Sequence, residues 1–84
     1  MSVVNVVTDL DGTICDYSHR LAHLKKKDWH EFNRLCGFDK PIIPILDLVK
    51  AMHSYGANIY VFTARPIDYY KQTKLWLDKW RVPF

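Results

Sequence analysis

Val3–Thr13, with the sequence VVNVVTDLDGT, is the stretch from which the architecture of this 84-residue chain is best argued. Its four valines are interrupted only by Asn5. This composition is typical of a strand that is buried on both faces in a parallel sheet, rather than of an alternating, half-exposed strand. Two acids, Asp9 and Asp11, end the valine run. Because ligands bind at the carboxyl ends of strands in open α/β sheets, these acids are the first candidates for a functional site.

Asp9 and Asp11 are predicted to hold Mg²⁺. Two carboxylates this close together repel each other, and burying them requires a compensating charge. A hard divalent cation that prefers oxygen ligands, Mg²⁺ by default, is the simplest source of that charge. An isolated Asp-x-Asp pair is more often a turn with two solvated acids, but the preceding valine strand and the following Gly-Thr favour a site.

The segment Asp9–Ile14, DLDGTI, resembles the first signature motif of the haloacid dehalogenase-like hydrolases, DxDGT followed by an apolar residue. Most members of that family are phosphatases. The resemblance implies that Asp9 is a nucleophile that forms an aspartyl-phosphate, that Asp11 is the general acid/base, and that Mg²⁺ lies beside them. Such a mechanism is chemically reasonable because water then attacks an anhydride-like phosphate, while the metal screens the charge between Asp9 and the substrate.

A helix and a second strand are predicted to follow, completing a βαβ unit. Pro44 suits the first turn of the helix, Gly56 suits its end, and Ala57–Phe62 is rich in β-branched and aromatic residues. The crossover should be right-handed, with Val3–Thr8 and Ala57–Phe62 parallel. The apolar stripe of the helix consists of Ile45, Leu48, Val49 and Met52.

Parallel pairing would bring the residue after the second strand to the sheet edge that carries Asp9. The family's second motif is a Ser or Thr at this place that binds the transferring phosphoryl group, and Thr63 matches it. Arg65 offers a planar fork that fits phosphate, although a surface ion pair is a nearly equal alternative. Thr13, inside the first motif, and Arg20 complete the candidates for phosphate or substrate binding.

Residues 14–40 are predicted to form a flap and a small cap-like insert. In the resembled family a single-turn helix and a β-hairpin flap cover the site here, so His19, Arg20 and His23 would face the substrate, with His19 or Arg20 as the direct contact; the alternative is a solvated loop. A short amphipathic helix is expected over Asp28–Cys36, because Trp29, Phe32 and Leu35 recur at helical spacing and Asp28 with Glu31 forms a pattern like a capping box at its start.

The last helix is expected over about residues 68–80, and its apolar face is interpreted as core rather than as a ligand platform. The spacing from TARP at residues 63–66 through YYKQTKLWL to VPF, together with DYSHR after the first motif, also resembles the phosphatase domain of phage polynucleotide kinases. That resemblance implies substrates among nucleotides and polynucleotide 3′ ends. The sequence does not distinguish these from other phosphorylated small molecules.

Composition limits the remaining possibilities. The chain allows one small domain, residues 1–84, and its net charge of +3 is compatible with phosphorylated substrates. Cys15 and Cys36 lack a CxxC pattern and are interpreted as reduced thiols of a cytoplasmic protein, without a disulfide or zinc site. Neither a signal peptide nor a membrane span is evident, so no membrane partner is expected.

The resemblance covers only the first half of the family's core. We therefore expect an α/β fold with a Rossmann-type, three-layer parallel sheet, truncated after the second strand and its following helix. A short sheet would expose an unpaired edge beside an apolar face, which predicts a homo-oligomer or a missing carboxyl-terminal half. We expect that face to be lined by Val49, Met52, Trp76 and Trp80. The alternative to a phosphatase is a catalytically silent chain that binds phosphate or a partner.

Overall fold

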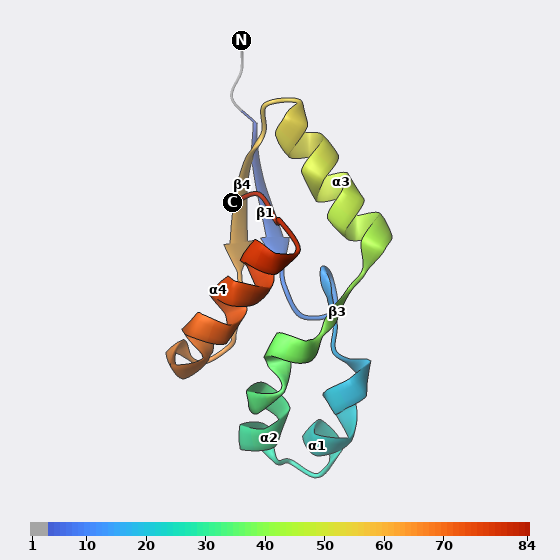
Figure 1. Ribbon diagram of the computed structural model, residues 1–84, viewed down its shortest axis with the longest axis vertical. Coiled ribbons are helices and arrows are strands. Elements are labelled where there is room, and N and C mark those ends of the chain that lie inside the picture. The colour runs from blue at the N-terminus through green and yellow to red at the C-terminus, as the bar shows by residue number, and fades with distance from the viewer. Residues whose placement is uncertain (1–3) are drawn as a thin grey trace.

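Strand β1, Asn5–Asp9, pairs in parallel with β4, Asn58–Phe62, in the computed structural model, which describes residues 4–84 (Figure 1). Val3 lies outside the described residues. The register runs from Asn5 opposite Asn58 to Asp9 opposite Phe62. Helix α3, Ile43–Ser54, connects the two strands and carries Pro44 in its first turn. The predicted βαβ unit with parallel strands is therefore confirmed.

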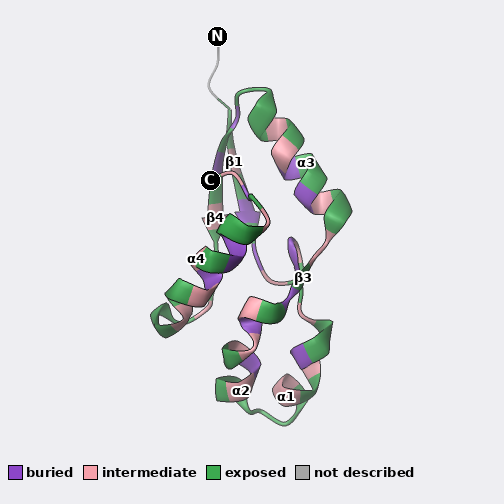
Figure 2. Ribbon diagram, in the orientation of Figure 1, coloured by how far each residue is buried: buried purple, intermediate pink, exposed green. Residues whose placement is uncertain are grey.

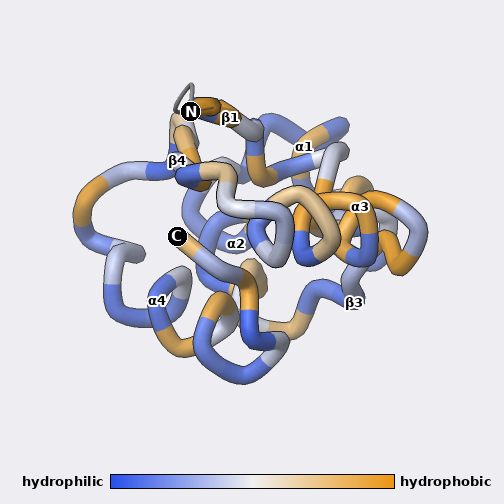
Figure 3. The backbone as a smooth tube through the Cα atoms, turned by 90° about the horizontal axis from the view of Figure 1, so that it is seen from above, coloured by the Kyte–Doolittle hydropathy of each residue, from blue (hydrophilic) through white to orange (hydrophobic). Residues whose placement is uncertain are grey.

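The prediction that the valine strand is buried on both faces is wrong. Side chains alternate along β1 and β4, so Thr8 and Ile59 are buried whereas Val7 is 58% exposed and Phe62 is 64% exposed. Helices α3 and α4, Tyr70–Lys79, both lie on the covered face, as the view from above shows (Figure 3). The α/β unit is therefore two-layered rather than three-layered, because β-branched composition marks a strand without setting how many of its faces are covered.

The buried sides of the two long helices meet the sheet in one core (Figure 2). In α3 the buried residues are Leu46 and Val49, whereas Leu48, which was assigned to the apolar stripe, is 54% exposed. Helix α4 follows a short 3-10 helix, η3, Ile67–Tyr69. Its buried residues are Thr73, Trp76 and Leu77.

The apolar face expected beside an open sheet edge also needs correction. Val49 and Trp76 are each only 2% exposed, because they pack beneath the sheet rather than beside it. The exposed apolar surface is instead the uncovered face of the sheet. Its large hydrophobic residues are Val7, Tyr60 and Phe62.

The insert leaves the core and returns to it at one point. Strands β2, Cys15–Asp16, and β3, Lys40–Pro41, pair antiparallel at its base. Between them the chain forms, in order, η1 (Ser18–Arg20), α1 (Leu21–Lys25), α2 (Trp29–Arg34) and η2 (Cys36–Phe38). No helix within residues 4–84 has the length and apolar character needed to cross a bilayer.

Candidate functional site

Asp9 and Thr63 lie at the carboxyl ends of the two paired strands. Asp9 is the last residue of β1, and Thr63 directly follows Phe62, its partner in β4. Both are exposed. Asp9 Oδ1 accepts the Leu10 N–H at 2.8 Å, and Thr63 Oγ1 accepts the Arg65 N–H at 3.1 Å. Within residues 4–84 the Asp9 carboxylate makes no ion pair, so it remains available to a ligand.

A tight turn after β1 carries Asp11 toward the insert. The completely buried Leu10 accepts the N–H groups of Thr13, Ile14 and Cys15 with its carbonyl oxygen. Gly12 has a φ of +78°, and a Cβ there would lie 3.1 Å from a ring carbon of Tyr17. The turn therefore requires glycine at this position. Thr13, a candidate phosphate ligand, is half-buried within it.

Arg65 holds the Asp11 carboxylate with its planar fork. Its Nε donates to Asp11 Oδ2 at 3.1 Å and its Nη2 to Asp11 Oδ1 at 2.7 Å. Its Nη1 donates to Thr73 Oγ1 at 3.0 Å, and its side chain is only 3% exposed. Of the two alternatives for Arg65, the structure shows an ion pair, but a buried one rather than one on the surface.

Arg20 binds Asp11 from the opposite side and is completely buried. Its Nη2 donates to Asp11 Oδ1 and to Asp39 Oδ2, both at 2.7 Å, while its Nε donates to Asp39 Oδ1 at 2.8 Å. Its guanidinium carbon lies 4.3 Å from the centre of the Phe32 ring. Direct contact of Arg20 with a substrate does not fit this burial, so its role in any site is to orient Asp11.

Asp39 is the member of this cluster that sequence reasoning missed. It is 3% exposed and also accepts Arg65 Nη2 at 3.3 Å. His19 Nε2 lies 2.6 Å from Asp39 Oδ1, and Trp76 Nε1 donates to the Asp39 carbonyl oxygen at 2.6 Å. No motif marks Asp39 in the sequence. It reaches the site because the antiparallel ladder at the base of the insert returns the chain to the core.

The surroundings of Asp11 favour its ionised form. Burial alone would raise the pKa of Asp11, but the hydrogen bonds and charges of Arg65 and Arg20 outweigh it and lower that pKa below its ordinary value. Asp11 is therefore a carboxylate at neutral pH, which suits a group that accepts a proton.

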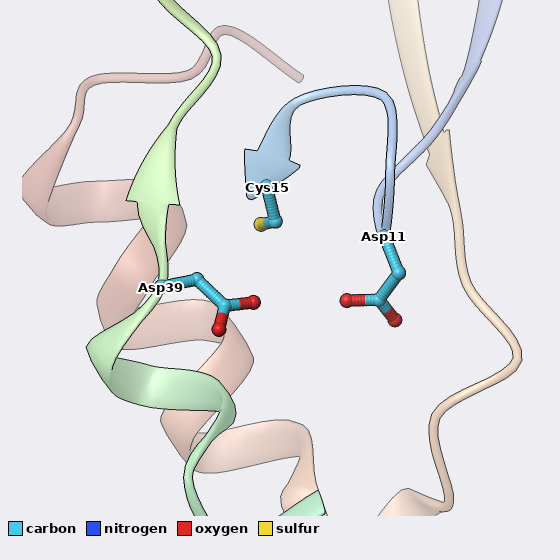
Figure 4. A group of neighbouring side chains, drawn as sticks. All are labelled: Asp11, Cys15 and Asp39. Atoms are coloured by element: carbon cyan, nitrogen blue, oxygen red, sulfur yellow. The ribbon is translucent and has the colours of Figure 1, made fainter. Parts of the chain in front are cut away.

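Asp11, Cys15 and Asp39 point toward one another, with one potential ligand atom from each lying within 4.8 Å of the others (Figure 4). This group does not fit Mg²⁺. Both carboxylates already bind guanidinium groups, so a cation would meet two positive charges. Burial also raises the pKa of the Cys15 thiol to about 12, and a protonated sulfur is a poor ligand for a hard cation.

The oxygen atoms around Asp9 are better suited to Mg²⁺. Asp9 offers an exposed carboxylate without a cationic partner among the described residues. The Asp11 main-chain carbonyl accepts no hydrogen bond within residues 4–84. Mg²⁺ typically binds one or two protein oxygens and keeps several waters or substrate oxygens. This donor set fits such a partly hydrated ion.

Two pockets flank Arg65. One, of about 310 Å³, lies between α2 and the segment after β4 and is lined by Asp11, Trp29, Phe32, Asn33, Ala64, Arg65 and Pro66. The other, of about 240 Å³, is lined by Thr63, Arg65, Pro66, Ile67, Tyr70 and Thr73. Asp9 lines neither of these two pockets, whereas Thr63, at the end of the neighbouring strand, lines the second.

No protein-family model matches the chain, and no curated protein or solved structure matches it either. The family resemblance of DLDGTI therefore rests on those residues alone.

Proposed function

We propose that this chain is a Mg²⁺-dependent phosphomonoester hydrolase in which Asp9 is the nucleophile. The observation that carries the proposal is the register of β1 and β4, which aligns Asp9 with Phe62 and so brings Thr63 to the same sheet edge. A nucleophile is supplied by an exposed carboxylate that makes no ion pair among residues 4–84. A neighbouring hydroxyl supplies a hydrogen-bond donor to the phosphate, and a second carboxylate two residues away supplies a proton acceptor.

In the first step, which requires the minor, protonated form of Asp11, an Asp9 oxygen attacks phosphorus, the bond from phosphorus to the ester oxygen breaks, and the leaving oxygen takes the proton from Asp11. Water then attacks the acyl phosphate and gives its proton to Asp11, which releases inorganic phosphate and restores Asp9. Because Thr63 Oγ1 accepts the Arg65 N–H, its own proton is free to bind a phosphoryl oxygen. Mg²⁺ bound by the Asp9 carboxylate and the Asp11 carbonyl would neutralise charge between Asp9 and the phosphate.

Hydrolysis of an aryl phosphate tests the proposal directly. We expect Mg²⁺-dependent turnover by the wild type and none by Asp9→Asn, which keeps the shape of the side chain but removes the nucleophile. Asp47→Asn is the matched control, because Asp47 is an exposed acid on α3, away from the sheet edge. Equal rates in the wild type and Asp9→Asn would refute the nucleophile assignment.

Beryllofluoride offers a second test that does not require turnover. With Mg²⁺ it mimics a phosphoryl group on a carboxylate, so a bound ¹⁹F signal should appear with the wild type and with Asp47→Asn. It should be lost in Asp9→Asn. A signal that survives in Asp9→Asn would place the phosphate site elsewhere.

A second candidate function is phosphate binding without hydrolysis. The observation that favours it is the double pairing of Asp11, since both carboxylate oxygens already accept hydrogen bonds from arginines. A chain of this kind would bind beryllofluoride or phosphate at Asp9 and Thr63, yet show no Mg²⁺-dependent release of phosphate from any ester. The two assays together distinguish the candidates.

A further inference from the structure

The pocket of about 310 Å³ between the insert and the segment after β4 has one polar corner and aromatic walls. Asp11 and Arg65 form the corner, whereas Trp29 and Phe32 come from α2. Asn33 adds an amide to the same helix face. In the proposed reaction Asp11 donates a proton to the leaving oxygen, so the group attached to that oxygen must lie next to Asp11. The inference below rests on that proposed function.

Trp29 is held in place although 59% of it is exposed. It is the first residue of α2, directly after Asp28, whose side chain accepts the Glu31 N–H at 3.2 Å and caps the helix. Its ring meets Phe32 edge to face, with centroids 6.1 Å apart and planes at 90°. Phe32 is in turn buried beneath the Arg20 guanidinium. An exposed ring with such support is ordered before a ligand arrives, which lowers the entropic cost of binding.

The segment after β4 is joined to the insert beside the pocket. The Tyr69 hydroxyl of η3 lies 3.3 Å from His30 Nδ1 of α2, and Arg65 Nη2 donates to Asp39 Oδ2 at 3.3 Å. The insert is therefore attached to the core at the pocket as well as at its base. The opening beside Asp11 keeps its shape without a ligand.

We propose that this pocket receives the leaving group of the substrate and selects phosphomonoesters whose alcohol carries an aromatic ring, with Trp29 as the specificity-determining residue. Stacking on Trp29 supplies the preference. Glycerol phosphates and sugar phosphates have no aromatic ring that could stack on Trp29, so this residue does not strengthen their binding.

Binding of two phosphonates, which cannot be hydrolysed, tests the pocket independently of turnover. Benzylphosphonate and ethylphosphonate carry the same charged group and differ in the ring. In the presence of Mg²⁺ we expect benzylphosphonate to bind the full chain about tenfold more tightly, the scale of stacking on one aromatic side chain. The indole N–H resonance of Trp29 should shift with benzylphosphonate only.

Three variants sharpen the test. Trp29→Ala should reduce the preference to within about twofold, the loss expected when one stacking partner is removed. Trp29→Phe should retain part of it. Tyr55→Ala is the matched control, since Tyr55 is a 94% exposed aromatic residue at the end of α3 and should leave the preference unchanged. Equal binding of the two phosphonates by the wild type, or a preference that persists in Trp29→Ala, would overturn the proposal.

Turnover separates this inference from the proposed function. Benzyl phosphate and ethyl phosphate have leaving alcohols of similar acidity, so a difference in kcat/KM reports the ring rather than the chemistry. Hydrolysis of both esters with equal kcat/KM would support the proposed phosphatase activity and overturn the proposed aromatic specificity of the pocket. If neither ester is hydrolysed but the phosphonate preference still depends on Trp29, the phosphatase activity is overturned. The pocket is then a binding site for phosphate esters that carry an aromatic ring.

Discussion

Arg65 illustrates how much one side chain contributes to this site, because its fork contacts Asp11 through two nitrogens and Thr73 through the third. Lysine would keep the charge but not this geometry. We expect Arg65→Lys to lower the free energy of unfolding by about 1–3 kcal/mol in urea denaturation, the scale for buried charged hydrogen bonds. Arg34→Lys, which alters an exposed pair with Glu31, should cause no measurable change, and equal effects would contradict the argument.

Cys15 should make stability depend on alkaline pH. Burial raises the pKa of its thiol from 9.0 to about 12, so the folded state keeps the proton that the unfolded state releases. The contribution is complete below pH 9 and is lost as the pH rises from 9 to 12, amounting to about 4 kcal/mol. Unfolding free energies across this range should therefore fall more steeply in the wild type than in Cys15→Ala. Parallel slopes would count against the burial effect.

Asp11 should give the reaction a pH dependence that varies with the leaving group. Because Arg65 and Arg20 outweigh burial and lower the pKa of Asp11, the protonated form needed for the first step becomes scarcer as the pH rises above that value. An alkyl leaving group needs this proton and an aryl one needs it less. We expect the ratio of alkyl to aryl phosphate hydrolysis to fall with rising pH. A flat ratio would mean that Asp11 is not the acid.

At the scale of single elements, α2 depends on its cap. Helices of six residues are marginally stable in water. The hydrogen bond from Glu31 N–H to the Asp28 side chain should therefore contribute strongly to the stability of α2. Asp28→Ala should cost about 1 kcal/mol and raise hydrogen exchange at the Glu31 amide. Asp28→Asn keeps an accepting oxygen and should behave like the wild type. Unchanged exchange in Asp28→Ala would show that tertiary contacts alone order α2.

At the scale of the whole molecule, the uncovered sheet face predicts self-association. The molecule extends 49 × 24 × 20 Å, and its radius of gyration of 13.7 Å exceeds the roughly 12 Å expected for a compact chain of this length. Exposed apolar faces and open strand edges pair with other chains. We propose a dimer through this face at micromolar concentration, measurable by sedimentation.

Val7→Lys would place a charge in the middle of that face and should give a monomer. Leu75→Lys is the control, because Leu75 is similarly exposed but lies on α4, which is on the other side of the sheet. A wild type that sediments as a monomer at these concentrations would refute the proposal.

Local signals in the sequence were sufficient for β1, β4, α2, α3 and α4 and for the two strand ends. The valine run, Pro44 at a helix start and the Asp28 cap each depend on neighbours along the chain, and the structure confirms them. Parallel pairing then follows from the βαβ order, which is why Asp9 and Thr63 were expected at one edge.

Local signals in the sequence could not predict the contacts between segments that are distant along the chain. The sequence shows neither that Asp39 returns to the site nor that Arg20 is buried, because both depend on the ladder that closes the insert. The single covered face of the sheet, with Val7 exposed, also depends on which side α3 and α4 share.

Sequence alone therefore determined where β1, β4, the cap of α2 and the acids after β1 lie, because backbone propensity and short spacings act locally. Tertiary structure decided that Asp11 is bound by two arginines while Asp9 makes no ion pair within residues 4–84. The reason is physical: the ionisation and accessibility of a carboxylate depend on the charges and burial around it, and those come from residues 20, 39 and 65, which only the folded chain brings together.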